Sequence, residues 1–284
     1  MNFTIIGGDR RQLETALFLK SLDHNVSTFG LSCTNEFSTL SNINDDISKC
    51  DAVILPLPVT TDGKTVNTLL SSDTIFIDDI LQCHPKLIFG GLITDNLSEK
   101  LSSRNIAYYD YYKSEALTIK NAVLTAEAAV AIAINCTDFS IFESEALVIG
   151  YGRIGRILSR YLKSLGANVT ATSRNNGVLS AIKADNITPE NTELVPLIAG
   201  KFDYIFNTAP YPILNRTFFK NCKKTVFVED LATNSGVDLA SAKEHGINAG
   251  IYSGLPGKHS PQTAAKYIAD EIINYLKGGN FSNG

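Results

Sequence analysis

The sequence predicts an α/β protein with two doubly wound parallel sheets joined by a bridging helix. Three observations predict it. Short β-branched segments alternate with amphipathic segments of helix length, this alternation occurs twice along the chain, and a long alanine-rich segment separates the two series. Parallel strands need crossover connections, usually helices, and the alternation therefore favours βαβ units.

The first series of elements occupies residues 1–118 and predicts a flavodoxin-like or Rossmann-like domain. A helix is expected over residues 10–22, where Leu13, Leu17 and Leu22 lie near one helical face, and another over residues 94–103. Strands are expected at residues 3–6, 26–29, 52–55, 74–77, 87–89 and 106–109.

The second series occupies residues 119–260 and begins with the bridging segment 122–135, which lacks Gly and Pro and favours a buried helix. Strands are expected at 146–149, 168–172, 204–207, 225–228 and 248–251, with a helix at 153–165. A last helix, 261–276, has Pro261 at its first position and Gly278 after its end. We expect segment 261–284 to pack back on the first domain, with a ligand cleft between the two domains.

Composition excludes several classes of function. The chain has 284 residues, 44% of them apolar and 19% charged, and its net charge of −4 includes no cluster of Lys and Arg. Nucleic acid and membrane partners are therefore not expected. No signal sequence and no apolar segment of membrane-spanning length are visible, which predicts a cytoplasmic protein. The five widely spaced cysteines predict neither a disulfide framework nor a metal site.

The strongest chemical signal is a glycine spacing placed between an apolar strand and a helix. Gly150 permits a tight turn, Gly152 lets backbone amides approach a diphosphate, and Gly155 lets the helix pack close to the strand. The diphosphate then lies on the helix N-terminus, where Arg153 and Ile154 contribute. This pattern predicts a Rossmann-like dinucleotide site.

The end of the next strand predicts which dinucleotide is bound. An NAD enzyme usually has Asp or Glu there for the ribose 2′-hydroxyl, but this chain reads Thr172-Ser173-Arg174. Arg174 can pair with a 2′-phosphate and Ser173 adds a donor, which favours NADP over NAD, although a solvated arginine in a turn is the alternative interpretation. The nicotinamide side is expected to be bordered by a further strand end, Asn207, Thr208, Ala209 and Pro210.

The N-terminal segment also combines a strand, a glycine turn and the start of a helix, but it lacks the third glycine of a dinucleotide-binding pattern. It predicts a small-anion site in which Gly7 and Gly8 expose amides and either Arg10 or Arg11 binds a carboxylate. An ordinary βα turn with solvated arginines is equally consistent with these residues.

Several segments together resemble the family of dipicolinate synthase A subunits in their order and spacing. The resemblance rests on Gly7-Gly8-Asp9-Arg10-Arg11-Gln12-Leu13, Leu55-Pro56, Thr125-Ala126-Glu127, the glycine segment 150–155, Gly254-Leu255-Pro256-Gly257 and Pro261-Gln262-Thr263-Ala264. It implies NADP-dependent oxidation of a dihydrodipicolinate-type precursor to pyridine-2,6-dicarboxylate, with a small flavoprotein-like B subunit. It also implies the mother cell of a sporulating bacterium as the location.

The resemblance also suggests which residues bind the dicarboxylate substrate and which accept a proton. Carboxylate contacts are expected from the N-terminal turn and from Lys258, with further donors from the bridging helix; the set is Gly8, Asp9, Arg10, Arg11, Asn121, Thr125 and Lys258. The candidate proton acceptors are Glu127, Asp230 and His259. For Glu127 a satisfied helix carboxylate, and for His259 a solvated loop imidazole, are the alternatives.

Three other functions are consistent with the same fold. A D-2-hydroxyacid dehydrogenase would need an Arg near Asp230-Leu231-Ala232-Thr233, and none is present. A shikimate-dehydrogenase-like enzyme gains support from Asn207-Thr208 but lacks an evident Lys/Asp pair in the first domain. A non-catalytic NADP-binding subunit is the alternative of another class. A homo-oligomer is possible in each case.

Overall fold

The computed structural model describes residues 1–31, 38–39, 47–232 and 235–278. The chain forms two compact units, Met1–Lys120 with Ser260–Gly284, and Asn121–His259. The division between them falls inside helix α5 (Glu115–Asn135).

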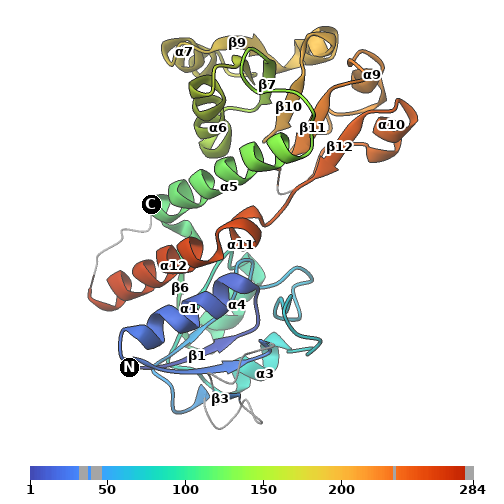
Figure 1. Ribbon diagram of the computed structural model, residues 1–284. Helices are drawn as coiled ribbons and strands as arrows, with labels where there is room; N and C mark the ends of the chain where they lie inside the picture. Colours follow the sequence, from blue (N-terminus) through green and yellow to red (C-terminus); the bar gives the residue numbers. More distant parts are fainter. Residues whose placement is uncertain (32–37, 40–46, 233–234, 279–284) are drawn as a thin grey trace. The chain divides into compact units, whose positions relative to one another are not determined.

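The first unit contains a six-stranded parallel sheet with the order β3-β2-β1-β4-β5-β6 (Figure 1). The strands are β1 (Asn2–Ile6), β2 (Asn25–Phe29), β3 (Ser38–Thr39), β4 (Ala52–Ile54), β5 (Leu87–Gly90) and β6 (Ala107–Asp110). From β1 the chain adds β2 and β3 on one side of the sheet. It then returns to the other side of β1, where it adds β4, β5 and β6. The carboxyl ends of β1 and β4 therefore form the switch point at which such sheets bind ligands.

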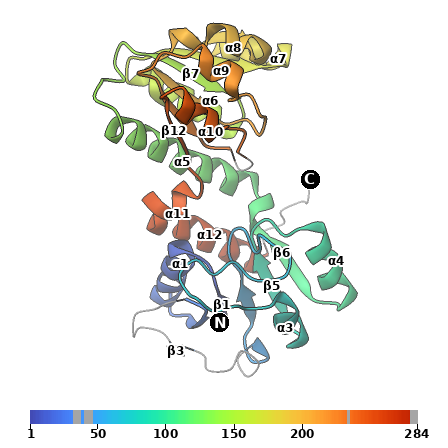
Figure 2. The same cartoon turned by 90° about the vertical axis from the view of Figure 1, so that its right-hand side faces the viewer.

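Helices cover both faces of this sheet. The first face is covered by α1 (Arg10–Ser21) and α12 (Pro261–Leu276), which lie side by side in both views (Figures 1 and 2). Their Ala16, Leu19 and Ile272 join Ile5 in one core. The second face is covered by α3 (Ile77–Gln82) and α4 (Asp95–Ser103), and a short 3-10 helix, η1 (Tyr111–Lys113), follows β6.

The second unit repeats the same topology, with the strand order β12-β11-β10-β7-β8-β9. Its strands are β7 (Glu145–Ile149), β8 (Asn168–Ser173), β9 (Thr188–Asn191), β10 (Tyr204–Asn207), β11 (Phe227–Asp230) and β12 (Asn248–Ile251). The switch point lies between β7 and β10, which pair in parallel from Ala146 with Tyr204 to Ile149 with Asn207.

The two faces of the second sheet are also covered. One core joins Ala129 of α5 and Leu158 of α6 (Arg153–Ser164) to Val148. A second core packs Phe218 and Ala242 against the opposite face of the same sheet, which carries Leu147. The remaining helices are α7 (Asn176–Ala184), α8 (Val195–Ile198), α9 (Arg216–Lys220), α10 (Leu239–Glu244), α11 (Leu255–His259), η2 (Thr192–Leu194) and η3 (Ala199–Lys201).

The structure corrects three predicted elements and adds strands that were not predicted. The strand expected at 74–77 is wrong, because α3 begins at Ile77 and the segment before it makes only an isolated bridge between Thr65 and Phe76. Its β-branched residues imitate a strand, whereas acidic residues in the first turn favour the helix. The bridging helix starts at Glu115, before the predicted 122. The strand predicted at 225–228 is β11, shifted to include Asp230. Edge strand β9 was not predicted, since it contains Pro, which edge strands tolerate.

Helix α5 also corrects the expectation that no apolar segment is long enough to span a membrane. By length and composition it could do so, with a mean hydropathy of 1.6, and it is the one such helix among the described residues. Half of that apolar window is buried, however, and Ala126, Ala129 and Ala133 are fully enclosed in the core of the second unit. The composition of α5 is accounted for by this core position.

Candidate functional site

The glycine turn after β7 requires glycine at two positions because of close packing. Gly150 has a φ of +94°, and a Cβ placed on it would lie 2.8 Å from Oγ1 of Thr208. A Cβ on Gly155 would lie 2.2 Å from the carbonyl oxygen of Gly150. The turn and the first turn of α6 are thus packed against each other and against the end of β10.

Gly152 differs from these two glycines because the space beside it is open. A Cβ on Gly152 would meet no atom within 4 Å, and its φ of −79° is accessible to any residue. Gly152 is the N-cap of α6, and no side chain caps this helix. An open position beside an uncapped helix start is what an incoming diphosphate needs, since the first-turn amides and the helix dipole both favour an anion. The residues present fit a dinucleotide.

Thr208 connects the two strands at the switch point. Its backbone amide and its hydroxyl both donate to the carbonyl oxygen of Ile149, at 2.9 and 3.0 Å. Ala209 follows, and its Cβ lies 3.3 Å from the position of a Cβ on Gly150. The predicted strand-end residues therefore lie directly beside the glycine turn.

The end of β8 presents Ser173 and Arg174. Oγ of Ser173 accepts a hydrogen bond from the amide of Asn175, whose side chain caps α7. Arg174 is exposed, and its Cζ lies 4.1 Å from the centre of the Tyr211 ring. Tyr211, which directly follows Pro210, was not singled out in the sequence. Its position just past a strand end at the carboxyl edge was the available signal.

Asp230 at the end of β11 is completely buried and accepts four hydrogen bonds. Its Oδ1 accepts from Nδ2 of Asn207 and from the amide of Ala232, both at 3.0 Å. Its Oδ2 accepts from Oγ of Ser235 at 2.8 Å and from the amide of Gly236 at 3.0 Å. A carboxylate whose lone pairs are occupied in this way holds loops in place, which argues against the predicted role as proton acceptor.

The other two predicted proton acceptors lie on exposed surface. The charge of Glu127 on α5 acts on Tyr161, and burial together with this charge raises the pKa of that phenol. Tyr161 lies about two turns beyond the glycine turn along α6, so Glu127 is not at the carboxyl edge of the strands. His259 and its neighbour Lys258 are exposed at the end of α11, and their side chains make no hydrogen bond to the part of the chain that the structure describes.

The two predicted donors on α5 form one local hydrogen bond. Oγ1 of Thr125, a buried residue, donates to the carbonyl oxygen of Asn121 at 2.9 Å. The Thr125 hydroxyl proton is therefore used within the helix. Asn121 is half-buried.

The N-terminal turn does not expose its amides, which corrects the predicted small-anion site. The amide of Gly7 donates to the carbonyl oxygen of Phe29 at 2.8 Å, and that of Gly8 donates to the carbonyl oxygen of Asn67 at 2.7 Å. Both donors are consumed within the same unit, one by the last residue of β2 and the other by a loop residue. The turn is therefore a structural βα connection at these two residues.

Arg10 and Arg11 have different environments. Arg11 is 7% exposed, pairs with Asp9 at 2.8 Å and donates to the carbonyl oxygen of Leu57 at 2.6 Å. Asp9 also caps α1 through a capping box with Gln12. Arg11 is therefore fully engaged, whereas Arg10 is exposed and has no ion pair among the described residues. Of the two, Arg10 is the one available to a ligand.

Glu229 is a buried acid that sequence reasoning missed. It is fully buried, neither carboxyl oxygen has a hydrogen-bond partner among the described residues, and burial raises the pKa of Glu229 to about 9. Its side chain belongs to the sheet face that carries Phe227 and Leu231, since residues alternate along β11. A charged residue inside an apolar strand was the signal for it.

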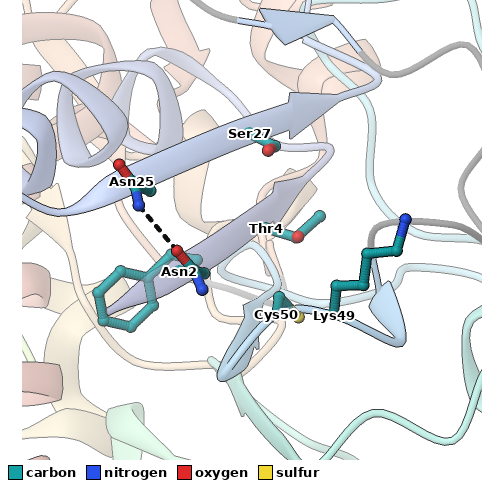
Figure 3. Close-up of a pocket in the computed structure, with 7 residues that line it drawn as sticks. Asn2, Thr4, Asn25, Ser27, Lys49 and Cys50 are labelled. Atoms are coloured by element: carbon teal, nitrogen blue, oxygen red, sulfur yellow. Dashed lines mark hydrogen bonds between the residues drawn. The ribbon is translucent and has the colours of Figure 1, made fainter.

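A small pocket in the first unit lies near the amino ends of β1 and β2 (Figure 3). Nδ2 of Asn25 donates to Oδ1 of Asn2 at 2.9 Å on one side of it. Its lining is Asn2, Phe3, Thr4, Asn25, Ser27, Lys49 and Cys50. Open α/β sheets bind ligands at the opposite edge, beyond the carboxyl ends of the strands, and this pocket is therefore not the expected site.

Similarity in sequence and similarity in structure point to one family. Residues 2–112 match the family model for the N-terminal domain of the dipicolinate synthase A subunit. The dipicolinate synthase A subunit of Bacillus subtilis (strain 168) is 28% identical, with 97% of this chain and 96% of that protein aligned. The crystal structure of the dipicolinate synthase A subunit from Bacillus halodurans has a TM-score of 0.86 at 27% identity and covers 97% of each chain.

A more distant structure shows how widely the architecture is shared. The apo-structure of D-lactate dehydrogenase from Escherichia coli has a TM-score of 0.65 at 14% identity, with 100% of this chain and 99% of that chain covered. This likeness shows the fold alone and confirms the predicted α/β class with two doubly wound sheets. The predicted resemblance is also confirmed, since the chain is similar to dipicolinate synthase A subunits in both sequence and structure.

Proposed function

We propose that this chain oxidises a dihydrodipicolinate-type precursor to pyridine-2,6-dicarboxylate with NADP, as the A subunit of a dipicolinate synthase. The observation that carries the proposal is the glycine turn at the β7/β10 switch point. There, two glycines are required by packing while Gly152 beside the uncapped α6 opens onto free space. The similarity to the dipicolinate synthase A subunit of Bacillus subtilis suggests the substrate class.

The nucleotide is proposed to bind along the carboxyl edge of the second sheet. Gly152 and the first-turn amides of α6 hold the diphosphate, and Arg174 with Ser173 contacts the 2′-phosphate. The bound nicotinamide supplies the hydride acceptor. The strand end Asn207–Pro210 borders it, because Thr208 holds the end of β10 against the glycine turn.

The substrate carries two carboxylates, and a cation is the natural partner of each. Arg10 is one candidate, since it is exposed whereas Arg11 is consumed by Asp9 and Leu57. Lys258, which is also exposed, is another candidate. An exposed guanidinium or ammonium keeps its full charge for a carboxylate.

Aromatisation of the ring releases a hydride and a proton, and the proton needs an acceptor. His259 is our candidate, because it is exposed and imidazole is the side chain that most commonly takes up protons near neutral pH. Asp230 is not our candidate, because its carboxylate already accepts four hydrogen bonds. The proposed partner is a flavoprotein-like B subunit, and the proposed location is the cytoplasm of the mother cell of a sporulating bacterium.

The test has two parts. Calorimetry with the full chain should show NADP binding, and Gly152→Ala should weaken it. NADP reduction should then follow addition of the dihydrodipicolinate precursor, with the chain alone or with its B subunit. Absence of NADP binding would remove the cofactor assignment.

A second candidate function is a non-catalytic NADP-binding subunit. It is favoured by the complete hydrogen bonding of Asp230, which leaves only exposed groups among the predicted proton acceptors. Binding of NADP without turnover, even with the B subunit present, would select this candidate. Oxidation of a D-2-hydroxyacid instead would select the dehydrogenase interpretation.

A further inference from the structure

We infer that Tyr211 is a positioning residue that orients Arg174 toward the ribose 2′-phosphate, and that the two side chains together determine the preference for NADP over NAD. The inference rests on the proposed function, because it concerns how the same nucleotide site selects its cofactor. It adds a residue that neither the glycine turn nor the end of β8 contains.

The contact between the two side chains is a cation–π stack. Cζ of Arg174 lies 4.1 Å from the Tyr211 ring centre, inside the range of about 6 Å for this interaction. Tyr211 is 43% exposed, and the Arg174 side chain makes no hydrogen bond or ion pair within the described ranges. The ring is therefore the contact that restrains this guanidinium.

Stacking restrains Arg174 without consuming what a phosphate needs. A guanidinium covered on its face keeps its N–H donors, which lie in its own plane, available at the edge. A tyrosine ring is neutral, so the guanidinium keeps its whole charge, whereas a carboxylate partner would compensate it. An exposed arginine loses rotamer freedom when it binds a phosphate, and prior stacking reduces that loss.

The Tyr211 backbone is itself held tightly. Its amide donates to the carbonyl oxygen of Ala209 at 2.9 Å, and its carbonyl accepts from the amide of Ile213 at 2.8 Å. A Cβ on Gly236 would lie 1.9 Å from the Tyr211 carbonyl oxygen, so only glycine fits at 236. The ring is thus presented from a fixed turn.

One buried carboxylate anchors the two segments that meet at this turn. Asp230 binds Asn207, whose side chain also exchanges hydrogen bonds with the backbone of Ala209, on the Tyr211 side. Asp230 also accepts from the amide of Gly236, on the other side. This network explains why a loop residue can hold a defined position opposite Arg174.

The experiment compares Tyr211→Leu with Tyr211→Phe in the full chain. Dissociation constants for NADP and NAD are measured by calorimetry at one fixed salt concentration, since phosphate contacts depend on salt. Tyr211→Leu should lower the NADP-to-NAD affinity ratio about twofold to fivefold, the range for an exposed cation–π contact. Tyr211→Phe keeps the ring and should leave the ratio at its wild-type value within the error of the measurement.

The double variant tests whether Tyr211 acts through Arg174. Arg174→Leu should remove most of the preference, and adding Tyr211→Leu should then change the ratio no further. The inference is overturned if Tyr211→Leu lowers the affinity for NADP and for NAD equally, or if the affinity ratio is unchanged. If the wild-type chain prefers NADP and only Arg174→Leu removes this preference, the proposed function is supported and the role of Tyr211 is excluded. If the wild-type chain shows no preference for NADP, both are excluded.

A measurement on the wild-type chain covers the case in which Tyr211→Leu does not fold. A ring stacked on a guanidinium shifts the Nε–H resonance of that arginine upfield, and Arg174→Lys assigns the signal. The shift should persist when NADP is bound. Its disappearance on NADP binding would mean that the nucleotide displaces Tyr211, which overturns the positioning role.

Discussion

Asn207 and Asp230 form a buried hydrogen bond of 3.0 Å between the ends of two neighbouring parallel strands. The two residues stand directly opposite each other in the β10/β11 register, and both are completely inaccessible to solvent. Because the carboxylate accepts four hydrogen bonds at the edge where such sheets bind ligands, it links the core of the sheet to the loops of the proposed nucleotide site.

The first prediction concerns Asp230. Asp230→Leu removes the acceptor of four donors and should lower the free energy of unfolding by about 3–5 kcal/mol, because buried donors left without an acceptor cost about 1–3 kcal/mol each. Asp230→Asn should cost less, since one amide oxygen still accepts. Urea unfolding followed by circular dichroism measures both. A variant that keeps its stability but loses turnover would instead make Asp230 a proton acceptor.

The second prediction separates two glycines of the same turn. Gly155→Ala places a Cβ against the Gly150 carbonyl oxygen and should destabilise the chain by about 1–3 kcal/mol. Gly152→Ala meets open space and should cost less than about 1 kcal/mol, the loss expected because Ala is a poorer N-cap than Gly. It should nevertheless weaken dinucleotide binding by about tenfold or more, because the methyl group occupies the space of the diphosphate.

Unfolding curves and calorimetric titrations of both glycine variants check this prediction. Normal binding by Gly152→Ala would show that no ligand approaches that backbone, and the glycine pattern would then be explained by packing alone.

The third prediction uses the adjacent arginines as a matched pair. Arg11→Leu removes a buried guanidinium from Asp9 and from the Leu57 carbonyl, and should cost about 2–3 kcal/mol of unfolding free energy. Arg10→Leu should change stability by less than about 0.5 kcal/mol, because its side chain is exposed. If Arg10 binds a substrate carboxylate, its loss should raise KM about tenfold or more, and an unchanged KM would exclude that contact.

The fourth prediction concerns pH and Glu229. Burial raises the pKa of Glu229 from its ordinary value of 4.5 to about 9, so the folded chain keeps a proton that the unfolded chain releases. The stability contributed by this group is complete below about pH 4.5 and is lost as the pH rises toward about 9. Glu229→Gln does not titrate and should become more stable relative to wild type as the pH rises.

The measurable quantity for Glu229 is the difference in unfolding free energy between Glu229→Gln and wild type. Between about pH 6 and pH 8 it should shift toward the variant by up to about 1.4 kcal/mol per pH unit. Glu193→Gln, which changes an exposed carboxyl of the same unit, is the control. A difference that does not vary with pH would mean that Glu229 is ionised in the folded chain.

The local sequence was sufficient to predict structure where the residue type alone determines the backbone conformation. The spacing of Gly150, Gly152 and Gly155 between a strand and a helix predicts the turn, and the structure shows the close packing that makes two of them necessary. The alternation of strand and helix segments predicted two doubly wound sheets, because burial on both faces of a parallel sheet imposes it. The prediction of a strand at 74–77 was wrong, because the β-branched residues there precede a helix.

Which groups a side chain contacts, by hydrogen bond, ion pair or stacking, was decided only by the tertiary structure. Arg10 and Arg11 are indistinguishable in sequence, yet one faces solvent and the other binds Leu57, because the end of β4 lies beside β1. One donor to Asp230, Asn207, comes from the neighbouring strand β10, and the other three follow Asp230 in the chain but reach its carboxylate only because the loop turns back toward it. The stack of Tyr211 on Arg174 joins the ends of β10 and β8. Such pairings depend on which strand ends meet at one edge of a sheet, and no local pattern in the chain records that.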